Sequence, residues 1–284
     1  MKKFFETLGI ISLMICSFWY TDKTASVMKE KDDIMVAIKK AEEKEIIDIN
    51  EAIITNDTII PGVHTSQIDE NKSYNKMKEI GYFDNSFLIY KNVNPKILLE
   101  QNYDKYIISG NKKKNNISFL FKIHQNTTIH DVKRILTILN KKRIKSDFFV
   151  DGYFLEENND LMYDIIRNGH QLQNLSYKED YTNPSFLWLD AVLKKLNHQK
   201  VGYCYLENKD KKTLNICSTY KNHVIIPNLV LEHHALATIK KNVKPGNLIS
   251  IKVNSQMIDE LPIIIDYIKS RGYKITLLKE HLKE

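Results

Sequence analysis

The sequence predicts an α/β fold over residues 114–284, with a mostly parallel sheet connected by crossover helices. The first observation is an alternation. From Ile117 onward, short apolar runs of strand length are separated by longer segments with apolar residues at helical spacing. The second is size and composition. The chain has 284 residues, 43% of them hydrophobic, which is enough for one large domain and a smaller one.

The alternation gives a definite set of elements. The expected strands are 117–122, 146–151, 170–175, 200–205, 223–228, 247–253 and 273–277. The expected helices lie near 129–142, 159–168, 185–198, 209–220, 232–241 and 256–271. Functional groups in such folds lie beyond the C-terminal ends of the strands, so candidate site residues are sought there.

Residues 1–25 are typical of a targeting segment. Lys2 and Lys3 precede a largely apolar run from residue 8 to residue 20, and no convincing small-residue cleavage site follows it. We therefore expect an uncleaved signal anchor, with a cleaved signal peptide as the alternative. The expected location is the cell membrane, single-pass with the C-terminal domain extracytoplasmic, or else the protein is secreted.

Two further segments precede the α/β domain. Residues 26–52 are dense in charge and carry apolar residues near helical spacing, which predicts an amphipathic helix that holds the domain away from the membrane. Residues 53–113 predict a small α+β module that packs on the domain. Its expected elements are strands at 53–60, 86–93 and 106–109 and a helix at 73–80.

The formal net charge of +7 does not by itself indicate a nucleic-acid partner. Such a partner would require basic residues gathered on one face. The densest run, Lys112 to Lys114, directly precedes a predicted strand and is interpreted as a solvated loop. No nucleic-acid binding is predicted.

Three segments carry a family resemblance. They are the strand at 117–121, the run Asp147-Phe148-Phe149-Val150-Asp151-Gly152, and the stretch from Gly169 to Glu179. The second and third resemble the motifs T-F-F-V-x-G and G-H-E-I-x-N-H-S-x-x-H of polysaccharide deacetylases of the NodB-homology type. The resemblance implies an irregular, open (β/α) barrel. Segments 60–62, 72–77 and 104–111 resemble the N-terminal extension of membrane-anchored deacetylase-like proteins of low-GC Gram-positive bacteria.

The residues that the family's chemistry needs are missing. The family uses an Asp-Asp pair after the first strand and two His after the third, to hold a divalent metal and to activate water. Here those places hold Lys122 and Ile123, then Leu175 and Glu179. A Lys at that place can replace the charge of the metal cation. No catalytic residue, no metal-ligand set and no cofactor is predicted.

The later motifs of the family are altered as well. The stretch from Val201 to Glu207 lacks the Arg-Pro-Pro-type segment, and the strand at 247–254 lacks the final His. We therefore expect a catalytically inactive deacetylase-like protein of the cell envelope that binds a glycan or a protein partner. Whether the chain is an enzyme is left open.

Two alternatives remain. One is a metal-dependent carbohydrate deacetylase with a rebuilt metal site, drawn from His124, Glu179, Asp180 and His233 or His234. The other is a purely structural barrel that positions the N-terminal module.

Tyrosines gather around the predicted mouth of the barrel and are the candidate ligand-binding residues. They are Tyr153, Tyr177, Tyr181, Tyr203 and Tyr205. Sugars stack on aromatic faces and form hydrogen bonds with tyrosine hydroxyls, so a glycan groove can outlast the loss of catalysis. The competing interpretation is that Tyr203 and Tyr205, two positions apart, share one face of a strand and pack in the core.

The chain has three cysteines. Cys16 lies in the targeting segment, and Cys204 and Cys217 lie in the folded part. An extracytoplasmic location permits a disulfide between the last two, and two separate buried thiols are the alternative.

Overall fold

The computed structural model describes residues 2–44, 51–178, 180–182 and 184–284. The chain divides into two compact units. The N-terminal unit comprises residues 1–49 and 64–94, and the barrel unit comprises residues 50–63 and 95–284. Residues 53–113, predicted as one module, therefore contribute to both units.

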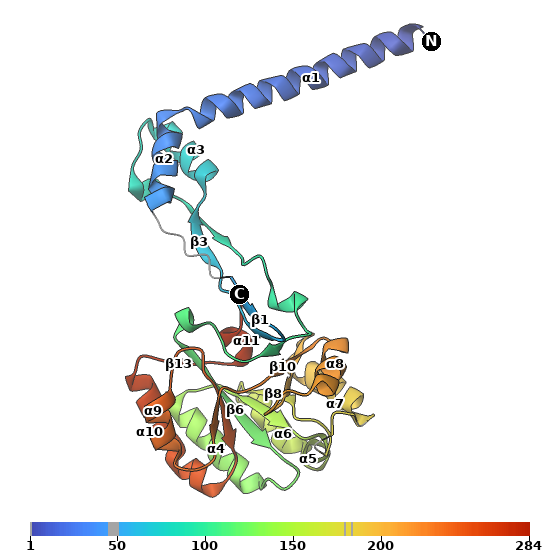
Figure 1. The fold of residues 1–284 in the computed structure, drawn as a ribbon, viewed down its shortest axis with the longest axis vertical. Coiled ribbons are helices and arrows are strands. Elements are labelled where there is room, and N and C mark those ends of the chain that lie inside the picture. Colours follow the sequence, from blue (N-terminus) through green and yellow to red (C-terminus); the bar gives the residue numbers. More distant parts are fainter. Residues whose placement is uncertain (1, 45–50, 179, 183) are drawn as a thin grey trace. The chain divides into compact units, whose positions relative to one another are not determined.

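The N-terminal unit is mainly helical (Figure 1). Its elements are α1 (Lys2–Glu30), α2 (Asp33–Lys44), α3 (Glu70–Ile80) and an antiparallel pair of strands, β3 (Thr65–Ile68) and β4 (Tyr90–Val93). A cluster in its core contains the buried residues Ile34, Ile38, Ile68 and Met77. Among the described residues, no helix combines the length and apolar content that crossing a membrane requires.

The helix predicted over 26–52 is divided between two helices in its described part. Helix α1 continues to Glu30, and α2 begins at Asp33 after a short turn. The carboxylate of Asp32 accepts a hydrogen bond from the backbone N–H of Ile34 at 3.0 Å, which caps the new helix. Residues 45–50 of the prediction lie outside the described residues.

The barrel unit is built on one open, mixed sheet (Figure 1). The strand order is β1 (Ile53–Thr55), β2 (Thr58–Ile60), β5 (Tyr106–Ile107), β10 (Asn222–Ile225), β9 (Gly202–Tyr205), β8 (Gln171–Asn174), β7 (Asp147–Val150), β6 (Asn116–Ile123), β12 (Leu248–Lys252) and β11 (Leu229–Leu231). Strand β13 (Lys274–Ile275) also pairs with β6. The pairs are parallel except β1 with β2. The predicted α/β class and mostly parallel sheet are confirmed.

Helices connect these strands, and a short one follows the last strand. They are α4 (Ile129–Lys142), α5 (Gly152–Glu157), α6 (Asn159–Arg167), α7 (Ser185–Asn197), α8 (Lys211–Thr219), α9 (Ala235–Asn242), α10 (Ser255–Ser270) and α11 (Leu278–His281). Helix α4 has the predicted bounds, because its ends are encoded locally. Thr128 caps its first turn by accepting a hydrogen bond from the Asp131 N–H, and Arg143 ends it in the left-handed conformation.

The alternation of side chains along β6 divides the core into two layers. Phe119, Phe121 and Ile123 face the helices, where the Phe121 and Phe148 rings stack with centroids 5.0 Å apart. Leu120 belongs to a second cluster on the opposite face of the sheet, with Phe149 among its neighbours. Because successive strand residues point to opposite faces, Lys122 shares the Leu120 face and Ile123 does not. Burying each of these aromatic side chains contributes about 2 kcal/mol.

Two predicted strands differ from the structure. The strand predicted at 53–60 is a hairpin, β1 and β2, turned at Asn56, whose φ of +53° suits a tight two-residue turn. The strand predicted at 86–93 begins only at Tyr90, because residues 85–87 form a 3-10 turn capped by Asp84.

Candidate binding cleft at the barrel mouth

A cleft of about 470 Å³ opens at the C-terminal ends of β6, β8 and β9. This is the edge of a parallel α/β sheet where functional sites are expected. The residues that line it are Lys122, His124, Leu175, Ser176, Asp180, Tyr181, Thr182, Tyr205, Leu206, Glu207, Asp210 and Thr213. Most of these side chains carry a hydroxyl group or a charge, so the cleft is a polar site.

Lys122 is the buried cation of the cleft. Its side chain is 8% exposed and forms an ion pair with Glu207. Its ammonium group also lies 5.3 Å from the centre of the Tyr205 ring, a cation–π arrangement. A buried charge needs such partners to offset its loss of hydration. Lys122 thus places a fixed positive charge where the resemblance predicts a metal-site carboxylate.

Glu207 follows β9 and is the outer partner of this pair. Its side chain is 48% exposed, so water reaches it freely. The hydrogen bond and the charge of Lys122 hold the pKa of the Glu207 carboxyl below its ordinary value, and His124 acts in the same direction. The carboxylate is therefore ionised at neutral pH and neutralises Lys122.

Tyr205 forms a wall of the cleft and is itself fixed. Its hydroxyl forms a hydrogen bond with the Ser250 hydroxyl at 2.7 Å, and its ring packs 5.4 Å from Phe149. Burial raises the pKa of the Tyr205 phenol, so the hydroxyl stays protonated. A rigid ring with a neutral hydroxyl is left beside the open space.

Tyr181 joins the ends of β8 and β9. Its hydroxyl accepts a hydrogen bond from the Tyr205 N–H at 2.9 Å and lies 2.9 Å from the carbonyl oxygens of Asn174 and Tyr205, to which it can donate. The residue is 8% exposed. Its hydroxyl is therefore used inside the fold, although part of the side chain lines the cleft.

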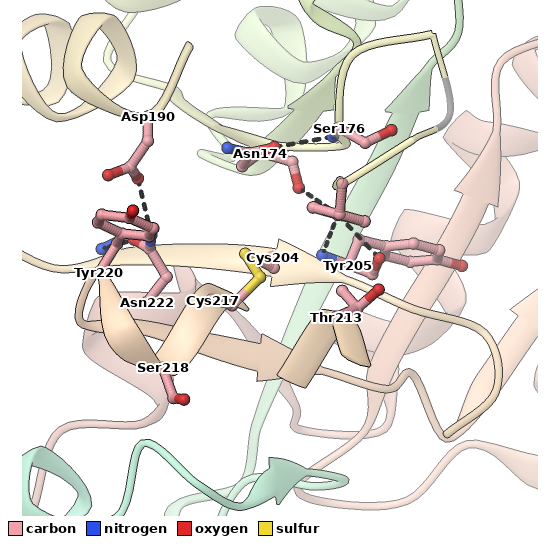
Figure 2. Close-up of a disulfide and its surroundings, with 12 residues drawn as sticks. Asn174, Ser176, Asp190, Cys204, Tyr205, Thr213, Cys217, Ser218, Tyr220 and Asn222 are labelled. Carbon is pink, nitrogen blue, oxygen red and sulfur yellow. Dashed lines mark hydrogen bonds between the residues drawn. A yellow bond between two sulfur atoms is a disulfide. The ribbon is translucent and has the colours of Figure 1, made fainter. Parts of the chain in front are cut away.

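The turn after β8 is held by side-chain hydrogen bonds. The Asn174 side-chain oxygen accepts from the Ser176 N–H at 2.8 Å (Figure 2). Ser176 has a φ of +83°, a conformation that a non-glycine residue adopts only when its surroundings enforce it. The turn therefore presents Ser176 at the cleft in a fixed geometry.

Two acids lie on the rim. Asp180 accepts hydrogen bonds from the N–H and hydroxyl of Thr182 at 2.8 and 2.7 Å. Asp210 caps α8 and accepts from the Lys212 N–H and from the N–H and hydroxyl of Thr213. These bonds, first those from the threonine side chains, lower the pKa of both carboxyls. Both acids are ionised at neutral pH.

A disulfide joins Cys204 of β9 to Cys217 of α8 (Figure 2). The sequence left two alternatives, a disulfide and two separate buried thiols, and the structure has the disulfide. Both cysteines are fully buried. The bond fixes α8, and with it Asp210 and Thr213, against the strand that leads to Tyr205 and Glu207. Cys16 is an exposed free thiol on α1.

The structure separates the five predicted tyrosines. Tyr181 and Tyr205 line the cleft. Tyr203 is buried in the same cluster as Tyr205, so these two residues do share one face and pack together. Tyr177 donates a hydrogen bond to Glu156 at 2.8 Å, and Tyr153 carries Lys178 4.7 Å from its ring centre. Neither of the last two lines the cleft, and ligand binding by the five residues stays a prediction.

The donor set does not fit the metal of the deacetylases. Lys122, Ile123 and Leu175 cannot serve as its ligands. Within the described parts of the chain, no group of three or more His, Cys, Asp and Glu side chains could hold a metal ion. Of the residues considered for a rebuilt site, His124 and Asp180 line the cleft.

His233 and His234 do not line the cleft, and they are exposed beside α9. Glu179 lies outside the described residues. Sequence reasoning missed Thr182, Asp210 and Thr213 as lining residues. An available signal was the Asp210-x-x-Thr213 spacing, which is typical of a helix N-cap.

The chain was compared with known proteins. No protein-family model matches the chain. The uncharacterized protein YlxY of Bacillus subtilis is 31% identical over 155 residues, which cover 54% of this chain and 48% of YlxY. The chain therefore spans about half the length of the curated relative it matches.

Solved structures match over more of the chain. BA3943 of Bacillus anthracis, described as a CE4 family pseudoenzyme, has a TM-score of 0.67 and 24% identity over 89% of this chain and 96% of BA3943. A BA3943 mutant described as having restored enzymatic activity has a TM-score of 0.68, also at 24% identity, over 89% of this chain and 99% of that one. A family 4 carbohydrate esterase of B. anthracis has a TM-score of 0.52 and 23% identity, over 63% and 87%.

The sheet order and the cleft define an α/β half-barrel of the polysaccharide deacetylase type. The resemblance predicted from the sequence is confirmed: the barrel unit has the fold of the CE4, or NodB-type, deacetylases. Three solved forms of BA3943, a protein described as a CE4 family pseudoenzyme, each match 89% of this chain.

Proposed function

We propose that the chain is a catalytically inactive, deacetylase-like protein that binds a cell-envelope glycan in the cleft at the barrel mouth. The observation that carries the proposal is the Lys122–Glu207 ion pair, at the place where the resemblance predicts a metal-site carboxylate. An open space of about 470 Å³ remains beside that pair. The donors and acceptors around it suit sugar hydroxyl groups.

The chemistry of the lining supports a sugar ligand. Thr182 contributes an exposed hydroxyl, and Asp180 has further acceptor capacity toward sugar hydroxyls. Ser176 and Thr213 also line the cleft, as buried residues. The Tyr205 ring adds an amphipathic wall. Because the tyrosine, the strained turn and α8 are fixed before any ligand arrives, binding costs little ordering of the site.

The proposal is tested by titrating soluble peptidoglycan and chitin oligosaccharides into the full chain. Asp180→Ala removes a rim acceptor, and we expect it to weaken binding about tenfold or more, since a lost hydrogen bond to a charged group costs about 1.5–3 kcal/mol. The matched control is Asp160→Ala, which changes an exposed acid on α6 that does not line the cleft. Equal affinity of both variants would place the ligand elsewhere.

The alternative function is a metal-dependent carbohydrate deacetylase with a rebuilt metal site. One observation favours it: His124 and Asp180 line the same cleft. Metal content after dialysis against zinc, cobalt or manganese separates the two functions. Stoichiometric metal that is lost in His124→Ala would favour the enzyme, and a metal-free protein that still binds glycans would favour the proposal above.

For location we propose that residues 1–25 attach the chain to the cell membrane, with the barrel unit outside the cytoplasm, or that they are cleaved and the protein is secreted. The support is the apolar run of α1, whose side chains at Phe18, Trp19 and Tyr20 are exposed. Membrane fractionation, with the mass of the mature N-terminus, distinguishes the two cases. Recovery of the full-length chain in the cytoplasm would contradict both.

A further inference from the structure

The Lys122–Glu207 pair is uneven, and its two charges are held in different ways. Lys122 lies near the end of β6, a strand paired on both sides, and is 8% exposed, so it cannot leave the cleft floor. Glu207 follows the end of β9 and is 48% exposed. A buried ammonium needs an anion beside it. The fold therefore buries the ammonium group of Lys122 but leaves its partner, the carboxylate of Glu207, half-exposed.

Glu207 has few other bonds to hold it in place. Besides Lys122, its recorded side-chain contact is the Tyr205 hydroxyl at 3.5 Å, the outer limit of a hydrogen bond. Leaving Lys122 costs this carboxylate little, because water can hydrate it at once. An anionic group of a ligand can therefore take its place.

The cleft also offers room and a second donor for an incoming anion. Lys122, His124 and Glu207 all line the same open space. Lys122 lies near the end of β6, and His124 directly follows the strand, two positions later. Both also favour the ionised form of Glu207 by lowering the pKa of its carboxyl.

Two further acids of the cleft set the orientation of the ligand. Asp180 and Asp210 are ionised there, and each accepts hydrogen bonds from neighbouring threonines. They repel an anion and accept bonds from hydroxyl groups. A ligand with one acidic group and several hydroxyls therefore has a single favourable direction in the cleft.

We propose that Lys122, with His124, forms an anion subsite that Glu207 occupies in the free protein, and that the glycan taken by the cleft is an acidic sugar whose anionic group displaces Glu207. This inference rests on the proposed glycan-binding function and names the class of its ligand. Carboxylate and phosphate share the required chemistry, and the test distinguishes them.

The test uses the full chain at low salt with three monosaccharide probes, glucuronate, glucose 6-phosphate and glucose, followed by NMR titration. The wild-type protein is expected to prefer one of the anionic probes over glucose. Glu207→Gln removes the internal competitor, and we expect it to bind that probe about tenfold more tightly. Lys122→Met keeps the apolar stem, and the ratio of its affinity for the anionic probe to its affinity for glucose should fall about tenfold.

Two controls complete the design. Glu79→Gln and Lys141→Met change exposed charges on α3 and α4 that are not among the residues lining the cleft, and they should leave all three affinities unchanged. Raising the salt concentration should weaken the anionic probe alone. If Lys122→Met does not fold, the gain expected in Glu207→Gln still decides the question.

The outcomes separate this inference from the proposed function. Tighter anion binding in Glu207→Gln supports both. Equal affinity of the three probes, with no change in Glu207→Gln, overturns the anion subsite while glycan binding stands. Absence of binding by these probes and by the peptidoglycan and chitin oligosaccharides overturns both.

Discussion

At the scale of single residues, Lys122 is the most consequential side chain in this chain. It lies on the inner face of the sheet because side chains alternate between the two faces along β6. There it forms an ion pair with Glu207 and a cation–π contact with Tyr205. The sequence showed that a Lys had replaced a metal-site carboxylate. It did not show which acid would form an ion pair with this Lys, because Glu207 lies 85 positions away in the sequence.

The two halves of this pair should contribute unequally to stability. Glu207→Gln leaves a buried ammonium without a counter-charge, and we expect a loss of about 1–3 kcal/mol in the free energy of unfolding. Lys122→Met leaves a carboxylate that is already half-exposed, so its cost should be smaller. Urea unfolding of both variants measures the difference, and a larger loss for Lys122→Met would contradict the assignment.

A second prediction at the scale of single residues concerns Tyr181. Tyr181→Phe removes the hydroxyl that bonds the Tyr205 N–H and leaves buried backbone groups without that partner. We expect a loss of about 1–3 kcal/mol in the free energy of unfolding and weaker glycan binding, because the cleft wall loosens. Tyr163→Phe, at a residue 56% exposed on α6, is the matched control. Equal stability of both variants would count against the structural role of Tyr181.

At the scale of elements, the disulfide fixes α8 to β9 and so shapes one side of the cleft. Its two cysteines are 13 positions apart, and closing a loop of that length stabilises a fold by about 3 kcal/mol in the chain-entropy description. Cys217→Ser should therefore lower the unfolding free energy by about 2–4 kcal/mol. Cys16→Ser, which changes the free thiol, should have no effect. Unfolding with and without reductant gives a second reading, since wild type should lose stability on reduction and Cys217→Ser should not.

The elements also show what the sequence could predict. Helix α4 was placed at its observed bounds because its cap and its apolar period are local. Helix α5 was missed because it has six residues, too few to show a period. Strand β11 was missed. The strand predicted at 223–228 ran past the end of β10 over Pro227, which supplies no N–H to a sheet, and stopped before Leu229.

The candidate site was less predictable than the fold. Strand ends could be ordered along the sheet, which placed Lys122, Asp180, Tyr205 and Glu207 near the mouth. Side-chain direction could not be assigned before the strand register was known. Tyr153 and Tyr177 turn to partners outside the cleft, and Thr182 enters it through a turn whose conformation depends on Asp180.

At the scale of the whole molecule, buried histidines set the response to acid. Burial lowers the pKa of His170 and His223 to about 4 and that of His281 to about 3. An unfolded histidine titrates near 6.5, so between pH 6.5 and 4 the unfolded chain binds protons that the native chain does not. Burial of Asp147 acts in the opposite sense by raising its pKa to about 7.

Three histidines outweigh one aspartate, so the unfolded chain should bind about two more protons near pH 5. We expect the free energy of unfolding to fall as the pH drops from 6.5 toward 4, and to change little between pH 7 and 8. Denaturant unfolding across this range checks the sign. His223→Phe should reduce the slope by about one proton if it folds, and stability that rises on acidification would contradict this assignment.

The central claim is that the cleft binds a glycan without a metal. Its most direct test is calorimetric titration of a soluble peptidoglycan oligosaccharide into the full chain, with and without EDTA. The claim predicts one site per chain, an affinity that EDTA does not change, and a loss of about tenfold or more in Asp180→Ala. Binding that needs a divalent ion, or that Asp180→Ala leaves intact, would contradict it.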